Sequence, residues 1–149
     1  MISLSRCLVD SSTLLRLCTS TRDRFPWCYQ AVRKLHASGC ELYVTPQIAS
    51  EFFTVSTRPV NQNGHGLAPQ EASQLLTALE QGMTLLPETA EVDAIWRNLI
   101  ATHTLLGAHI HDAKIAAAML AHAIPHILTL NTADFDPYPT LSALHPSAI

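Results

Sequence analysis

The sequence predicts an α/β fold in which helices pack against a mainly parallel β-sheet. Short apolar runs that resemble strands alternate along the chain with longer stretches of helical periodicity, which is typical of a parallel sheet. Proline near the first turn and glycine beyond the last turn mark several of the helical stretches. The hydrophobic fraction of 48% against 14% charged residues indicates a packed core and excludes a disordered chain.

The first strand and the first long helix are predicted in the amino-terminal third. Residues 7–9, CLV, form a short apolar run that ends at Asp10 and is followed by polar serines, so we predict a buried strand. Pro26 opens a helical pattern that Gly39 closes. Residues 41–44, ELYV, form the second predicted strand.

The middle of the chain is predicted to hold two helices separated by a loop. Thr45 is the predicted cap and Pro46 the first residue of a helix that runs through Val55. Residues 58–69, RPVNQNGHGLAP, are rich in Gly, Asn and Pro and are predicted to be a loop. The next helix starts at the last proline of this loop and ends at Gly82.

The carboxy-terminal part continues the alternation. Residues 84–87, TLLP, resemble a strand, and helices are predicted over about 88–105 and about 112–122. Residues 126–130, HILTL, form the next predicted strand, and a last short strand is predicted near 141–144.

Length, charge and cysteine spacing limit the class of protein. A length of 149 residues is typical of one domain, so residues 1–149 are predicted to form a single domain. No apolar run approaches the ~20 residues that cross a bilayer, and the amino terminus lacks a signal-peptide pattern, so a cytoplasmic protein without membrane contact is expected. The four cysteines lie far apart, which favours reduced thiols over a zinc site. The formal charge of −3 means that any contact with a nucleic acid must be local.

Acidic and polar side chains follow the predicted strands, at the edge where open parallel sheets bind their ligands. Asp10 follows the first strand, and Asn131 and Asp134 follow the fourth. Asp112 begins the preceding helix, and Glu51 lies in a helix among apolar neighbours. Clustered carboxylates repel one another unless they are protonated or bind a divalent cation, and an oxygen-only ligand set favours Mg²⁺ or Mn²⁺. We therefore predict a metal site that activates water for phosphodiester hydrolysis.

Most of these residues also have a purely structural interpretation. Asp112 by itself fits a helix cap, and Asp10 fits an ordinary turn at the end of a strand. Glu51 has no cation within one helical turn, so a local ion pair does not explain it. His109 and His111 point apart on a helix, so we interpret them as polar surface or substrate contacts and not as metal ligands.

Four segments in their order along the chain carry a family resemblance: LVDSS around Asp10, VTPQIASEF around Glu51, IHDAKIAA around Asp112 and ILTLNTADF around Asn131. The chain resembles the PIN-domain ribonucleases and, within them, the VapC-type toxins of toxin–antitoxin pairs, nearly from end to end. The resemblance implies a three-layer α/β/α fold and a Mg²⁺- or Mn²⁺-dependent endoribonuclease whose metal is held by Asp10, Glu51 and Asp112. Ser12 matches a small polar position that supports the first acid.

The fourth acid departs from the commonest family pattern. Many PIN domains carry an aspartate where this chain has Asn131, whereas Asp134 lies three residues later, as in the NxxDF form common among the toxins. We take Asp134 as the fourth metal ligand and Asn131 as a supporting or substrate-contacting residue, and the reverse assignment stays open. The resemblance also implies an RNA substrate, a cognate antitoxin that blocks the site, and often a homodimer. An apolar stripe on the helices at 26–35 and 46–55 is the predicted dimer or antitoxin surface.

Two other classes of function fit parts of the sequence. A catalytically inactive PIN-like domain would bind RNA or protein as a scaffold, but the chain retains the three principal acids. An aspartate-nucleophile phosphatase also begins with a strand that ends in aspartate, but it normally requires a second acid two residues later, where this chain has Ser12.

Overall fold

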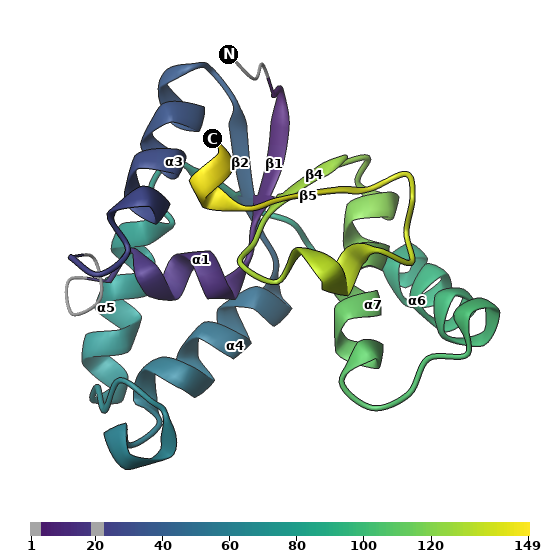
Figure 1. Ribbon diagram of the computed structural model, residues 1–149. Coiled ribbons are helices and arrows are strands. Elements are labelled where there is room, and N and C mark those ends of the chain that lie inside the picture. Colours follow the sequence, from purple (N-terminus) through teal and green to yellow (C-terminus); the bar gives the residue numbers. More distant parts are fainter. Residues whose placement is uncertain (1–3, 19–22) are drawn as a thin grey trace.

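A computed structural model describes residues 4–18 and 23–149 and shows a parallel sheet covered by helices on both faces (Figure 1). The strands are β1 (Arg6–Val9), β2 (Glu41–Val44), β3 (Met83–Leu85), β4 (His126–Leu128) and β5 (Ser142–Leu144). The α-helices are α1 (Ser11–Arg16), α3 (Pro26–Ala37), α4 (Pro46–Thr57), α5 (Pro69–Leu79), α6 (Ala90–His103) and α7 (His109–Ala121). Short 3₁₀ helices are η1 (Val60–Gln62), η2 (Thr132–Phe135) and η3 (Pro146–Ala148).

The strand order β3-β2-β1-β4-β5 places the first strand in the centre of the sheet. All four neighbouring strand pairs are parallel. Helices α1, α3, α4 and α5 cover one face, and α6 and α7 cover the other, because the chain crosses the sheet between β3 and β4 (Figure 1). The predicted α/β/α fold is therefore confirmed.

The strand order reverses between β1 and β4, and such a switch point leaves a crevice at the carboxyl ends of the two strands. Both strands are buried here: Leu8, Val9, Ile127 and Leu128 have no exposed surface. The core continues into α4 through Phe52, which is also fully buried. This apolar packing fixes the ends of β1 and β4 and the adjacent turn of α4.

The structure differs from the predicted elements at two places that concern the acids. Helix α1 follows β1 directly, whereas the sequence predicted only polar residues after Asp10. Helix α7 begins at His109, three residues before the predicted start. Both differences arise at helix amino termini, where sequence patterns locate boundaries only to within a few residues.

The structure also describes the cysteines and the lengths of the helices. The four cysteines are all buried: Cys7, Cys18, Cys28 and Cys40. Within the described parts of the chain, every helix is too short or too polar to cross a membrane.

Candidate active site

Asp10 lies at the carboxyl end of β1 and caps the first turn of α1. Its Oδ1 accepts a hydrogen bond from the Ser11 backbone N–H at 2.9 Å, and the side chain is only 7% exposed. The Asp10 backbone N–H donates to the carbonyl of Leu128 at 3.0 Å, which ties the end of β1 to the end of β4. The fold therefore fixes this carboxylate from both sides.

A hydroxyl network holds the second oxygen of Asp10. The Thr129 hydroxyl donates to Asp10 Oδ2 at 2.6 Å, and the Ser12 hydroxyl donates to the same atom at 3.1 Å. Ser12 Oγ in turn accepts from the Leu130 backbone N–H at 3.1 Å. Ser12 thus lies where the resemblance implied. Thr129 was not predicted from the sequence, because a threonine at the end of a strand usually indicates β-propensity and not a functional site.

Glu51 projects from α4 toward the start of α1. Its Oε2 accepts a hydrogen bond from the Ser11 hydroxyl at 2.8 Å, and its Oε1 accepts one from Gln47 Nε2 at 3.0 Å. Gln47 Nε2 also donates to the carbonyl of His111 at 2.9 Å, so one amide links α4 to α7. The ion pairs found among the described residues do not include Glu51, as expected from the sequence. Ser11 and Gln47 were both missed, because neither residue type in isolation indicates a role.

Asp112 is not the cap of its helix. The amino-terminal cap of α7 is Ala108, whose carbonyl accepts from the Asp112 backbone N–H at 3.4 Å, so Asp112 lies inside the first turn. Its Oδ2 is 3.6 Å from His109 Nδ1. The capping interpretation is therefore wrong, and the carboxylate remains free for another role.

The loop after β4 supplies the last two polar residues. The Asn131 backbone N–H donates to Thr129 Oγ1 at 3.1 Å, and the Asp134 backbone N–H donates to the Asn131 carbonyl at 3.1 Å. Asp134 lies half-buried in η2, whereas the Asn131 side chain is exposed. Asn131 therefore shapes the turn that presents Asp134.

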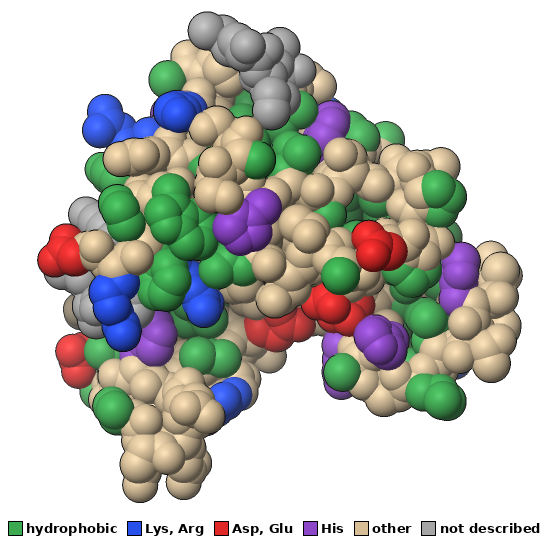
Figure 2. Space-filling model, in the orientation of Figure 1, with side chains coloured by type: hydrophobic (Ala, Val, Ile, Leu, Met, Phe, Trp, Pro, Cys, Tyr) green, Lys and Arg blue, Asp and Glu red, His purple; other side chains and the backbone are tan. Residues whose placement is uncertain are grey.

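The pKa of Asp112 shows that these acids share one electrostatic environment. The pKa of Asp112 is raised from 3.8 to about 6, mainly by burial and also by the nearby charges of Asp134, Asp10 and Glu51, whereas His109 opposes the shift. Burial also raises the pKa of Asp10, with Glu51 adding to the effect and the Thr129 hydroxyl opposing it. Figure 2 shows acidic side chains gathered at the head of a notch. The carboxylates thus repel one another across this notch.

The donor set of this cluster suits a hard divalent cation. Its ligand atoms are carboxylate oxygens, which Mg²⁺ and Mn²⁺ prefer. Among residues 4–18 and 23–149, no three His, Cys, Asp or Glu side chains are close enough together to form a ready-made metal site. Mg²⁺ usually binds only one or two carboxylates directly and keeps several waters, so it does not require three protein ligands close together.

The raised pKa gives Asp112 a definite effect on stability. The folded protein binds this proton more tightly than the unfolded chain, so the stabilisation is fully present below pH 3.8 and is lost as pH rises through about 6. We therefore compare the Tm of the metal-free parent with the Tm of the Asp112→Asn variant. The difference, parent minus variant, is expected to decrease as the pH rises from 3.8 to about 6. Thermal melts in EDTA at a series of pH values measure this difference, and a difference independent of pH would contradict the shift.

The fold and the acidic cluster together define a protein of the PIN class. The PIN domain family model matches residues 7–139, and the chain belongs to this family. No curated protein sequence is similar enough to the chain to count as a match.

Solved structures with the same fold come from VapBC toxin–antitoxin systems. The chain is similar to a chain in the structure of VapBC2 from Rickettsia felis bound to a DNA fragment from its promoter. The two sequences are 14% identical, the match covers 94% of the present chain and 98% of the VapBC2 chain, and the TM-score is 0.69. VapBC-1 from nontypeable Haemophilus influenzae gives 14% identity, 95% and 98% coverage and a TM-score of 0.68. VapC20 from Mycobacterium tuberculosis, a Sarcin-Ricin loop cleaving toxin, gives 16% identity, 89% and 95% coverage and a TM-score of 0.63. At such low sequence identities, these comparisons show that the chain has the same fold as these proteins.

Proposed function

We propose that this protein is a Mg²⁺- or Mn²⁺-dependent endoribonuclease and the toxin of a toxin–antitoxin pair. The observation that carries the proposal is the convergence of four acids from distant segments of the chain, Asp10, Glu51, Asp112 and Asp134, on one crevice of the sheet, where their charges act on Asp112. Membership of the PIN family and the fold shared with an RNA-cleaving toxin support the same function.

Asp10, Glu51, Asp112 and Asp134 would hold the cation in this proposal. A bound cation would lower the pKa of a water molecule and polarise the phosphodiester group. The chain's own part is to position the carboxylates: the hydroxyls of Ser12 and Thr129 fix Asp10. Both hydroxyls donate hydrogen bonds to the carboxylate, so they favour its ionised form. The ionised form carries the negative charge that attracts a cation.

Cleavage of mixed RNA by purified protein tests the activity. We expect cleavage with millimolar Mg²⁺ or Mn²⁺ and none in EDTA, because the acids cannot activate water without the cation. Cleavage that persists in EDTA would overturn the metal-dependent mechanism. Absence of cleavage with either metal, while RNA binding is retained, would instead indicate an inactive RNA-binding PIN domain.

Two substitutions distinguish the possible fourth ligands. We expect Asp134→Asn to weaken Mg²⁺ binding more than Asn131→Ala does, because Asp134 contributes the largest charge effect on Asp112 and removing a full charge costs more attraction than removing a neutral dipole. The Mg²⁺ concentration that half-saturates the rise in Tm measures this affinity. The reverse ranking would assign the fourth position to Asn131.

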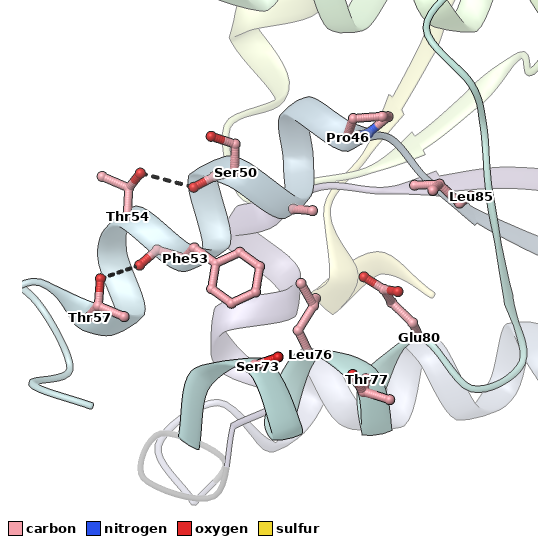
Figure 3. Close-up of a pocket in the computed structure, with 11 residues that line it drawn as sticks. Pro46, Ser50, Phe53, Thr54, Thr57, Ser73, Leu76, Thr77, Glu80 and Leu85 are labelled. Carbon is pink, nitrogen blue, oxygen red and sulfur yellow. Dashed lines mark hydrogen bonds between the residues drawn. The ribbon is translucent and has the colours of Figure 1, made fainter. Parts of the chain in front are cut away.

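A groove beside the site, lined by both apolar and polar side chains, offers a place for the antitoxin. It lies between α4 and α5, has a volume of about 760 Å³ and is lined by Phe53, Leu76 and Leu85 among others (Figure 3). Figure 3 shows the Phe53 ring and the Leu76 side chain pointing toward each other across it. Leu85 is 54% exposed, which leaves apolar surface for a partner to cover. The groove begins at Pro46 and Ser50, within a turn or so of Glu51, so a bound antitoxin segment would reach the acids.

A further inference from the structure

A second pocket lies one helical turn from the acids and is lined by basic side chains. It has a volume of about 510 Å³ and is bounded by α1, the residues just before α3, the end of α4 and the loop that follows α4. Among the residues that the structure describes, its charged and titratable lining side chains are Arg16, Arg24 and His65, and they include no aspartate or glutamate. We call this pocket, with its residues Arg16, Arg24 and His65, the basic pocket.

Two nitrogen atoms of the basic pocket are buried without a hydrogen-bond partner within the described structure: Arg16 Nε and His65 Nδ1. The rest of Arg16 is held in place, because its Nη1 donates to the Ser12 carbonyl at 3.1 Å and its guanidinium lies 5.2 Å from the centre of the Phe25 ring. A polar atom left unpaired away from water is costly, and a native structure normally explains it by a ligand or an ordered water. Both atoms belong to groups that bind anions.

The charges of the basic pocket act on one another without a visible counter-ion. Burial lowers the pKa of His65, and the nearby positive charges of Arg16 and Arg24 lower it further. The ion pairs found in the described structure include neither arginine. In a protein whose formal charge is −3, this is a local concentration of uncompensated positive charge.

The loop after α4 holds the histidine in position. The His65 backbone N–H donates to the Val55 carbonyl at 3.1 Å, Gly66 N–H donates to the Arg58 carbonyl at 2.8 Å, and Leu67 N–H donates to the Ser56 carbonyl at 2.9 Å. The loop is therefore folded back on α4, and its conformation is fixed before any ligand binds. Preorganisation of this kind reduces the entropic cost of binding.

The basic pocket lies one helical turn from the acidic cluster along two helices. Arg16 is four residues beyond Ser12 on α1, and Val55 is four residues beyond Glu51 on α4, which corresponds to about 6 Å along the helix axis in each case. Figure 2 shows basic and histidine side chains over α1 and the α4–α5 loop, on the same face as the acidic side chains. A polyanion that lies across the acids therefore passes over the basic pocket next.

We propose that the basic pocket binds a backbone phosphate of the RNA strand, one or two nucleotides from the bond that is cut. The proposal rests on the proposed ribonuclease function. A phosphate there would accept hydrogen bonds from the Arg16 and Arg24 guanidiniums and from His65, and would supply the missing negative charge. By holding one phosphate at a fixed distance from the acids, the basic pocket sets the register of the strand over the site.

RNA binding in EDTA tests the subsite separately from cleavage. We expect Arg24→Gln and Arg16→Gln to weaken binding of a mixed-sequence oligoribonucleotide by roughly three- to tenfold and to reduce the slope of log K against log salt by about 0.7. Arg24 is exposed, so its replacement leaves the fold intact even if the Arg16 variant is destabilised. The matched control is Arg33→Gln, which removes the same charge from an exposed position on α3 outside the basic pocket and should change neither quantity.

The ring signals of His65 give a second measurement. Inorganic phosphate should shift the ¹⁵N resonances of this ring and raise the pKa of His65 in the parent, and should do so less in Arg24→Gln. Unchanged RNA affinity and salt slope in both arginine variants would overturn the subsite, even if the parent cleaves RNA. Arginine-dependent RNA binding without Mg²⁺-dependent cleavage would support the subsite and overturn the proposed activity. A His65 shift produced by a glutamate-rich peptide, with RNA binding unchanged in the variants, would assign the basic pocket to a protein partner and overturn the proposal.

Discussion

Replacing Asp112 by asparagine is expected to reduce Mg²⁺-dependent RNA cleavage by roughly two orders of magnitude or more. The metal-free protein should keep or raise its Tm, because the substitution removes a half-buried carboxylate on which the charges of three other acids act. Added Mg²⁺ should no longer raise the Tm as it does for the parent. Thermal melts with and without Mg²⁺, together with the cleavage assay, measure all three effects.

A matched control for Asp112→Asn is Asp136→Asn. Asp136 is an exposed acid immediately after η2, and it does not contribute to the pKa of Asp112. Its replacement removes the same charge and should leave both cleavage and the Mg²⁺ response unchanged. Full activity in Asp112→Asn would eliminate the metal-site interpretation, and a collapse of the metal-free fold would show that Asp112 is structural.

Replacing Gly64 by alanine is expected to dislodge the loop that follows α4. A Cβ at this position would lie 1.9 Å from the carbonyl oxygen of Arg58, so the backbone must move. The loop would then lose the hydrogen bonds that tie it to α4, at a cost of about 2–3 kcal/mol, which corresponds to a fall in Tm of roughly 5–10 °C. Differential scanning calorimetry measures this change.

The control for Gly64→Ala is Gly107→Ala. Gly107 has a φ of +58°, and nothing lies within 4 Å of a Cβ built there, so alanine meets only the strain of the left-handed conformation. We expect it to cost about 1 kcal/mol. The Gly64 variant should also lose affinity for RNA, because His65 moves with the loop, whereas the Gly107 variant should not. Equal effects of the two substitutions on the Tm would contradict the steric argument.

The sequence predicted the parallel sheet and the segments that carry the acids, because the short apolar runs and the Pro and Gly punctuation are local signals. It did not predict helix α1, since Asp-Ser-Ser after a strand fits a turn as well as a helix start. It also misassigned Asp112 as a possible cap, because helix starts cannot be located to within three residues from composition. Thr129 and Gln47 were missed for a different reason. Their importance arises from partners that lie 119 and 64 residues away, and no local pattern encodes such contacts.

The hydrogen bond between Asp10 and Thr129 also determines when the acidic cluster forms. It joins residues 119 positions apart, and β1 occupies the centre of the sheet with β4 as one of its neighbours. Contacts this distant in sequence form late, because a long loop must close first. A nascent chain that has emerged from the ribosome only as far as α7 already carries Asp10, Glu51 and Asp112, but it lacks the strand that orients Asp10. We therefore expect the acidic cluster to assemble only after β4 has been synthesised, so that incomplete chains beside the translating ribosome lack an ordered cluster.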